Sequence, residues 1–196
     1  ASDEQFRLIC ETLQQSWLKL DGSEGLMTGA EKALWLKDFI ASSWPQLDKP
    51  CSESAKHTAM AFIEEREACF DPYDSFLVHA DAHADNTLKV NQGEGYKFVD
   101  PDGLFAEKAC DLAPIMRDWS SEVLADPQTR MLDRCRRLAE LTGVEQRPIW
   151  QWGFIERVST GLVLHKIGLA SEAKTMLAVA DAICAVDISI FDSGSG

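Results

Sequence analysis

The chain has 196 residues, of which 45% are hydrophobic, and this composition suits one compact domain with a sizeable core. Thirty-two acidic residues against 19 lysines and arginines give a formal net charge of -13, which would repel a phosphate backbone and argues against nucleic acid as a partner. The same charge would concentrate a cationic small molecule at a cleft, or it simply reflects an acidic, soluble surface.

The sequence gives no indication of secretion or of membrane insertion. Residues 1–7 are acidic and polar where a signal peptide would carry a basic start and an apolar run. No apolar stretch approaches the roughly 18–20 residues needed to cross a bilayer. The six cysteines are scattered singly, without the spacing of a zinc site or a disulfide framework. We therefore expect a soluble, cytoplasmic protein with reduced, mostly buried thiols and no membrane partner.

The amino-terminal part of the chain has helical periodicity. Apolar residues recur on one helical face from Phe6 to Trp17, and the glycine-containing segment 21–25 then breaks the pattern. This spacing predicts a first helix that ends near Leu20.

Two further helices follow. Thr28 or a neighbour can cap a second helix, which Trp44-Pro45 closes, and Ser52 or Ser54 can start a third. Both segments place their apolar residues at helical spacing, so we expect two amphipathic helices before residue 70.

The period changes in the middle of the chain. Phe76-Leu77-Val78 is a short apolar run that suits a buried strand. Residues 87–90 and 96–99 also have strand character, and the segment 91–95 between them is rich in turn residues. These two strands are therefore predicted to form a hairpin.

Helical spacing returns after the hairpin. It predicts helices over Leu112–Leu124, Gln128–Leu141, Pro148–Leu169 and Ser171–Val186, followed by a flexible tail over residues 193–196. The expected fold is a mainly helical α+β domain over residues 1–192, with a small central β-hairpin.

Three polar residues around the hairpin have the spacing of a phosphotransfer site. Kinase catalytic loops place His-x-Asp at the end of a strand, an Asn five residues after the Asp, and a second Asp beyond a short hairpin. Asp81, Asn86 and Asp100 fit this spacing. In such a site Asp81 orients a substrate hydroxyl and accepts its proton, while Asn86 and Asp100 supply oxygen ligands to the Mg²⁺ that bridges the ATP phosphates.

Other interpretations of these residues stay open from the residues alone. Asp and Asn after a strand are often only turn formers, and Asp100-Pro101-Asp102-Gly103 by itself is an ordinary turn sequence. The alternating His79, Asp81 and His83 could instead belong to a transition-metal site of a hydrolase. Such a site needs further ligands, and His57 and His165 are the only other histidines.

The segment from His79 to Asn86 resembles the His-Gly-Asp-x-His-x-x-Asn signature of the aminoglycoside phosphotransferase and choline-kinase superfamily. Similarity extends from about residue 26 to residue 180, which is far more specific than the loop alone. The stretches that resemble the streptomycin-kinase and hydroxyurea-phosphotransferase branch are Gly29–Ala33, Asp100–Leu104, Cys110–Ala113, Arg117–Trp119 and Trp152–Gly161.

This resemblance implies ATP-dependent phosphorylation of a hydroxyl on a small molecule, often an aminoglycoside, and hence the family's role in antibiotic resistance. Asp81 would be the catalytic base, with Mg²⁺ held by Asn86 and Asp100. His79 would brace the loop backbone, and Asp111 would support the loop. No phosphoenzyme is expected, because catalysis would rest on positioning and on charge neutralisation by Mg²⁺.

A second group of residues is expected near the acceptor. His83 matches the second His of the family loop and would contact phosphate or substrate, with a packing role as the alternative. Acidic and aromatic side chains would form a wall that suits ammonium groups, unless they are only helix caps and core tryptophans. This wall would consist of Asp102, Asp118, Trp119, Trp152 and Glu156.

The chain departs from the family pattern in two places. Ala80 stands where the family usually has Gly, but protein kinases carry Arg there, so the backbone need not demand glycine. Upstream of His79 there is no GxGxxG segment and no lysine in a V-A-I-K context. We therefore expect a protein-kinase-like carboxy-terminal lobe without its amino-terminal nucleotide lobe, a fragment that does not bind ATP on its own.

A rival hypothesis treats the chain as a non-catalytic remnant of such a kinase. It would then act as a binding module, or form a homodimer through the surface that the nucleotide lobe would cover. Self-association, or an exposed apolar surface beside the strand at Phe76–Val78, would favour this alternative.

Overall fold

A computed structural model describes residues 3–91 and 95–194. The α-helices are α1 (Asp3–Ser16), α2 (Gly29–Gln46), α3 (Glu53–Ala68), α4 (Ala109–Arg117), α5 (Ser120–Val123), α6 (Pro127–Thr142), α7 (Gln146–Lys166) and α8 (Ala170–Ile183). The strands are β1 (Leu18–Lys19), β2 (Met27–Thr28), β3 (Phe76–Val78), β4 (Thr87–Lys89), β5 (Tyr96–Phe98) and β6 (Leu104–Ala106), and the 3-10 helices are η1 (Pro72–Asp74), η2 (Ala84–Asn86) and η3 (Ile188–Gly194). The predicted fold class, mainly helical α+β, is confirmed.

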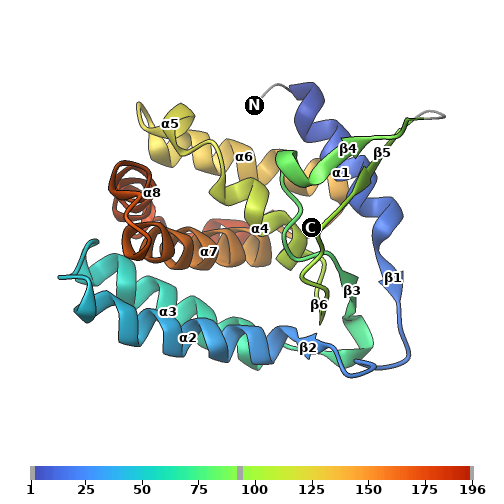
Figure 1. The fold of residues 1–196 in the computed structure, drawn as a ribbon, viewed down its shortest axis with the longest axis horizontal. Helices are drawn as coiled ribbons and strands as arrows, with labels where there is room; N and C mark the ends of the chain where they lie inside the picture. Colours follow the sequence, from blue (N-terminus) through green and yellow to red (C-terminus); the bar gives the residue numbers. More distant parts are fainter. Residues whose placement is uncertain (1–2, 92–94, 195–196) are drawn as a thin grey trace.

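Figure 1 shows how these elements are arranged. Helices α2 and α3 lie along one side, α7 crosses the middle, and α4 and α6 lie on the opposite side of α7. The short strands gather at one end of the molecule, together with α1. The polar loops that follow β3 and β5 therefore lie where the helical body meets the strands.

The predicted caps of α2 and α3 are present. The Thr28 side chain accepts a hydrogen bond from the backbone of Glu31, whose carboxylate accepts one from the Thr28 backbone in return. Ser52 caps α3 by accepting a hydrogen bond from Ala55. Pro45 does not stop α2 at once, since the helix continues one residue further to Gln46.

The first helix is shorter than its periodicity predicts. It ends at Ser16 rather than near Leu20, because Leu18 and Lys19 leave the helix and pair with β3 as β1. Backbone pairing with β3, of which only Val78 is fully buried, has thus overridden local helical spacing. The predicted helix over Leu112–Leu124 is likewise divided, since Trp119 adopts a left-handed conformation with φ 51° between α4 and α5.

The described residues form two small sheets, whereas the sequence predicts one hairpin and a separate short strand. The predicted hairpin is confirmed, with Leu88 opposite Lys97 in an antiparallel β4–β5 pair, although residues 92–94 of its turn lie outside the described residues. The strand at Phe76–Val78 is also confirmed, but it belongs to a second sheet in the order β1-β3-β6-β2, in which β2 is parallel to β6. Strands of two or three residues are too short to produce an alternating pattern.

Helix α7 is the centre of the core. Its buried side chains include Trp150, Trp152, Phe154 and the charged Arg157. Helix α4 approaches it closely because Gly153 has no side chain, and a Cβ there would lie only 2.4 Å from the Met116 Cβ. This close packing brings the end of α4 beside the middle of α7.

Other expectations concern single side chains and the chain end. All six cysteines are free thiols, with Cys69 exposed, Cys184 partly buried and the others buried. Residues 193 and 194 belong to η3 rather than to a free tail, whereas 195–196 lie outside the described residues. Within the described part of the chain, no helix combines the length and apolar character that a bilayer crossing requires.

Candidate active site

The loop that follows β3 is anchored from beneath by a buried carboxylate. Asp111, in the first turns of α4, is fully buried and accepts hydrogen bonds from the backbone N–H of His79 at 3.1 Å and of Ala80 at 2.5 Å. It also accepts one from the Trp17 indole N–H at 2.8 Å. Burial raises the pKa of Asp111, and the three donors oppose this increase. The carboxylate therefore fixes the direction in which the loop leaves the strand.

His79 links the loop to the strand that precedes Asp100. Its Nε2 lies 3.0 Å from the Val99 carbonyl oxygen, which can only accept, so Nε2 carries the proton. The other ring nitrogen, Nδ1, then accepts the backbone N–H of Asp81 at 3.3 Å. The ring also packs against Phe98, with 5.0 Å between the ring centroids. These contacts fit the bracing role that the resemblance implies.

Ala80 has a left-handed backbone, with φ 69°. This is a region in which an L-residue is disfavoured by roughly 1–2 kcal/mol, whereas glycine enters it freely. The backbone therefore favours glycine at this position without demanding it, since alanine occupies it. The two hydrogen bonds to Asp111 from His79 and Ala80 hold the loop in this conformation despite the side chain.

Asp81 lies at the centre of a polar cluster. Its side chain is 34% exposed, so it remains accessible to a small molecule. The Asn86 amide nitrogen donates to both the backbone oxygen of Asp81, at 3.0 Å, and its carboxylate, at 3.3 Å. His83 Nε2 lies 3.3 Å from Asp81 Oδ2. The single-turn η2 helix thus folds residues 83 and 86 back onto Asp81.

The hairpin brings Asn86 and Asp100 to the same end. The Val99 N–H donates to the Asn86 carbonyl at 3.0 Å, which continues the β4–β5 register by one step and places Asp100 next to it. Among the described residues, neither the Asn86 side-chain oxygen nor the exposed Asp100 carboxylate accepts a hydrogen bond. Free oxygens of this kind suit a hard cation such as Mg²⁺ that also binds phosphate.

Arg117 is a member of this cluster that sequence reasoning missed. It ends α4, and its guanidinium nitrogen Nη2 lies 3.5 Å from Asp81 Oδ1. The sequence indicates Arg117-Asp118-Trp119 only through the family resemblance, which assigns a substrate role to Asp118 and Trp119 and none to Arg117. Nothing in the spacing of Arg117 indicates that it lies beside a residue 36 positions earlier in the chain.

The predicted acidic and aromatic wall is largely not formed. Asp118 accepts a hydrogen bond from Arg117 at 3.1 Å, and Glu156 lies 3.5 Å from the Lys32 ammonium, so both carboxylates already have cationic partners. Trp152 is 2% exposed and donates to Glu107 in the core, which rules out a place on an open wall. For Trp152, the alternative interpretation as a core tryptophan therefore fits.

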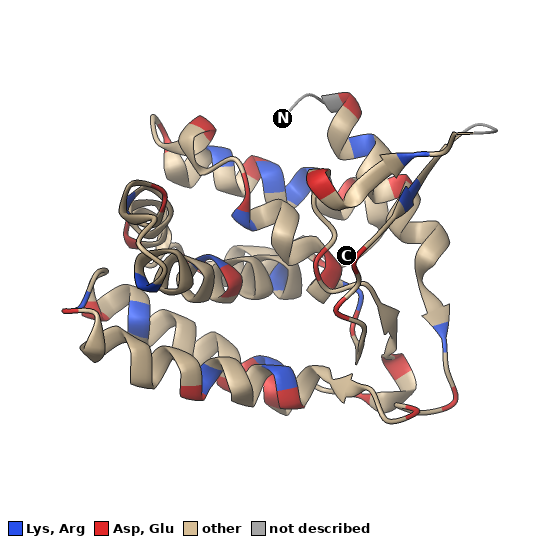
Figure 2. Cartoon of the chain, in the orientation of Figure 1, with Lys and Arg blue, Asp and Glu red and all other residues tan. Residues whose placement is uncertain are grey.

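Among the described residues, the remaining two members of that wall make no hydrogen bond or ion pair with Asp81. Trp119 packs on Phe6 and on the Arg134 guanidinium, between α1 and α6. Asp102 is exposed in the turn before β6, on the strand side of the molecule. Figure 2 shows acidic residues in the loops beside the hairpin and a group of basic residues on α6, at a different place on the molecule.

The transition-metal alternative finds no support in the geometry. The His79 ring is turned to the Val99 carbonyl, so it does not face the same point as Asp81 and His83. Within residues 3–91 and 95–194, no three His, Cys, Asp or Glu side chains are grouped so that they could hold a metal ion. His57 is exposed and His165 is partly buried, both on helices.

Comparison with known proteins gives one match. The family model described as aminoglycoside/hydroxyurea antibiotic resistance kinase matches residues 1–168. The matched segment includes the loop after β3, the hairpin, α4 and all of α7. No curated protein and no solved structure matches the chain.

Proposed function

The chain belongs to the aminoglycoside/hydroxyurea antibiotic resistance kinase family, and from this premise we propose that it transfers the γ-phosphoryl group of ATP to a hydroxyl of a small molecule. The acceptor would be an aminoglycoside such as streptomycin or a compound like it. One observation carries the proposal: Asp81 is partly exposed and bonded to Asn86, and the hairpin register brings Asp100 beside Asn86. This is the set of side chains that phosphoryl transfer requires.

The proposed roles follow from the chemistry of each group. Asp81 orients the acceptor hydroxyl and takes its proton, and the Asn86 amide keeps the carboxylate turned toward the acceptor. The Asn86 side-chain oxygen and the Asp100 carboxylate would hold Mg²⁺, which neutralises charge on the phosphates when bound. His79 and Asp111 hold the loop backbone and take no part in the chemistry.

The acidic surface supports a cationic acceptor. With a net charge of -13, the chain attracts polyamines and aminoglycosides over a distance of about one Debye length, roughly 8 Å at physiological salt. Asp102 is exposed and Asp81 is partly exposed, so both carboxylates remain accessible to the cationic groups of an acceptor. A cytoplasmic site of action fits, since ATP is the donor.

In a kinase of this kind, nucleotide binding requires a phosphate-covering loop and a lysine in addition to Asp81, Asn86 and Asp100. Residues 1–78 carry neither a glycine-rich phosphate loop nor a lysine in a V-A-I-K context. The described part of this segment, residues 3–78, forms helices and short strands instead. We propose that this chain is the catalytic, carboxy-terminal lobe and that a nucleotide lobe outside residues 1–196 completes the enzyme.

The decisive test replaces the proposed base in the full-length enzyme. Asp81→Asn keeps the size of the side chain but cannot accept the hydroxyl proton, so kcat should fall about 10²- to 10⁴-fold while the KM for MgATP changes little. Steady-state kinetics with streptomycin and a panel of related acceptors measures both constants.

Asp85→Asn is the matched control for this experiment. Asp85 lies four residues away in the same loop, is exposed, and has no side-chain contact with Asp81. Its replacement changes the net charge of the loop in the same way but should leave kcat within about twofold. An unchanged kcat in Asp81→Asn would remove the base assignment.

A further inference from the structure

Arg117 is a largely buried cation with three carboxylates close to it. Its side chain is 14% exposed, and its guanidinium lies 3.1 Å from Asp118, 3.5 Å from Asp81 and 3.8 Å from Glu156. A buried arginine without such partners would be strongly disfavoured. Burial by itself lowers the pKa of Arg117, but the neighbouring carboxylates more than offset this effect, so its pKa is raised.

The guanidinium is held from the side opposite Asp81. Thr160, on α7, lies 3.4 Å from Nη1, the nitrogen that also faces Glu156. The Lys32 ammonium on α2 lies 3.5 Å from the other oxygen of Glu156. Nε donates to Asp118. Asp118 and helix α7 therefore restrain the group, and Nη2 is the nitrogen directed at Asp81.

The contact with Asp81 is looser than the anchoring contacts. Asp118 accepts a well-formed hydrogen bond at 3.1 Å, whereas the separation of 3.5 Å to Asp81 is an ion pair without hydrogen-bond geometry. Asp81 already has Asn86 and His83 as closer partners. Arg117 is thus not needed to orient the carboxylate, and Nη2 keeps donor capacity for an oxygen that enters the cluster.

We propose that Arg117 contacts the phosphoryl group as it passes from ATP to the acceptor, acting as an arginine supplied by the chain itself; this inference rests on the proposed function. In the step, the acceptor hydroxyl oxygen forms a bond to the γ-phosphorus, the bond from that phosphorus to the bridging oxygen breaks, and the electron pair leaves with ADP. The hydroxyl proton moves to Asp81.

The charge balance explains why a cation belongs at this place. When Asp81 takes the proton its carboxylate becomes neutral, so Arg117 loses one of its three anionic neighbours during the step. The phosphoryl oxygens supply the missing negative charge at the same time, within reach of the same guanidinium. Because Asp118, Glu156 and Thr160 keep the group in place, it would need no reorganisation to stabilise the transition state.

The test compares substitutions of Arg117 in the full-length enzyme. Arg117→Ala should lower kcat about 10³-fold, in the range found for arginines that stabilise phosphoryl transfer. Arg117→Lys keeps the charge but not the fork of donors, so it should recover only part of the loss. The KM for MgATP should change by less than about threefold in each case.

A chemical rescue separates this role from a structural one. Millimolar guanidinium chloride should restore at least tenfold of the lost kcat in Arg117→Ala, and equal concentrations of sodium chloride or urea should not. Arg136→Ala provides the control, because Arg136 is exposed and its one ion pair within residues 3–91 and 95–194 is with Asp133 on its own helix. It should retain the wild-type kcat and show no response to guanidinium.

Each possible result supports or contradicts either the role of Arg117 or the proposed function. A kcat of Arg117→Ala within tenfold of the wild type overturns the inference, and so does a large loss that guanidinium cannot restore in a variant with an unchanged melting temperature. If Arg117→Ala does not fold, the folded Arg117→Lys variant decides, since an undiminished kcat there contradicts the need for the fork. If the wild-type enzyme phosphorylates no acceptor, that result contradicts the proposed function and not the role of Arg117 alone.

Discussion

Three hydrogen-bond donors converge on Asp111, and this one residue determines how the loop with Asp81 leaves its strand. The donors are the backbone N–H groups of His79 and Ala80 and the indole of Trp17, and the carboxylate that receives them is fully buried. Only an ionised carboxylate offers acceptors to all three without placing a proton against another proton. Asp111 therefore also compensates for the left-handed backbone at Ala80.

Replacement of Asp111 by Asn tests this arrangement. The amide nitrogen of Asn would have to face at least one of the three donors, so one or more buried N–H groups would lose their acceptor. We expect Asp111→Asn to lower the free energy of unfolding by about 1–3 kcal/mol, as measured by urea denaturation at neutral pH. Trp17→Phe, which removes one donor and leaves the backbone bonds, should cost less. Equal stability of Asp111→Asn and the wild type would contradict the account.

At the scale of elements, the contact between α4 and α7 positions the site. Arg117 directly follows Met116, whose Cβ occupies the space that a side chain at position 153 would need. Glycine in the middle of a helix costs roughly 1 kcal/mol relative to alanine, so its presence in α7 requires a packing reason. The close approach of α4 is that reason, and it places Arg117 within reach of Glu156 and Thr160.

Gly153→Ala should therefore be destabilising in spite of its better helix propensity. The new Cβ would lie 2.4 Å from the Met116 Cβ, an atom fixed to its own backbone, so α4 and α7 must separate. We expect a net loss of about 1–2 kcal/mol in urea denaturation, after the propensity gain is subtracted from the cost of overpacking. Gly161→Ala should cost less, because its nearest atom belongs to the end of the Leu177 side chain, which can turn away.

Gly22→Ala serves as the neutral control for both substitutions. Nothing lies within 4 Å of a Cβ at Gly22, and its backbone is outside the left-handed region. A Gly153→Ala protein as stable as the wild type would show that α4 and α7 can separate without cost.

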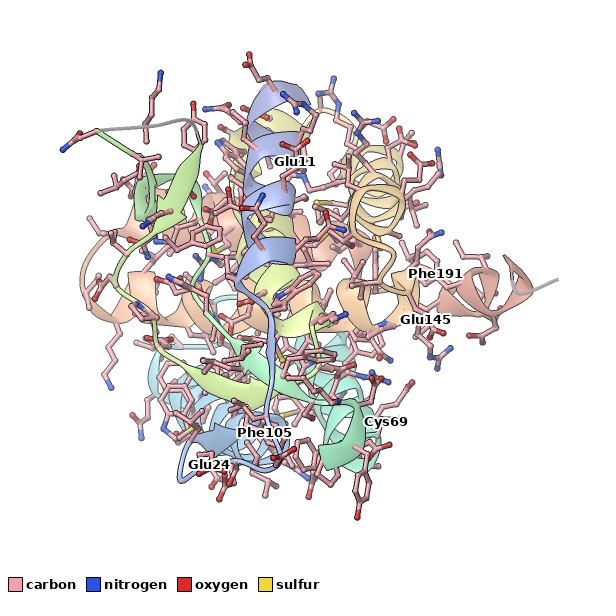
Figure 3. All side chains as sticks on the ribbon, turned by 90° about the vertical axis from the view of Figure 1, so that its right-hand side faces the viewer. Glu11, Glu24, Cys69, Phe105, Glu145 and Phe191 are labelled. Carbon is pink, nitrogen blue, oxygen red and sulfur yellow. The ribbon has the colours of Figure 1, made fainter. Side chains whose placement is uncertain are left out.

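At the scale of the whole molecule, the helical body meets the short strands at one end, and the acidic loops lie beside the hairpin there. Figure 3, which views the end of the molecule with the strands, shows α1 running over the body and β6, marked by Phe105, within the small sheet. Leu18 on β1 and Met27 on β2 are exposed apolar residues at this end. The residues proposed for chemistry are therefore carried by one compact lobe.

Calorimetric titration of residues 1–196 tests how far this lobe acts alone. We expect no heat from MgATP, and binding of streptomycin that weakens about tenfold when sodium chloride rises from 50 to 500 mM, because salt screens the attraction between the acidic lobe and the cationic acceptor. Hydroxyurea, which carries no charge, is the control for the salt effect. Micromolar binding of MgATP would show that the chain does hold a nucleotide site. If neither MgATP nor streptomycin binds, the result would favour a non-catalytic remnant.

The sequence by itself determined the fold class, most helices and the family. Long elements such as α2, α3, α6 and α7 repeat the same periodic signal over four or more turns, and caps such as Thr28 and Ser52 act on neighbouring residues. The spacing of Asp81, Asn86 and Asp100 could also be recognised in the sequence, because the three residues are connected by one short loop and one hairpin.

Only the tertiary structure decided the rest. The two-residue strand β1 exists because β3 lies beside it, and Trp152 is buried and donates to Glu107 instead of lining the predicted substrate wall. The place of Arg117 beside Asp81 depends on the contact between α4 and α7, across 36 residues of sequence. Local propensity and periodicity act over a few residues, whereas the partners of a buried charge or of a short strand are chosen by packing between distant segments.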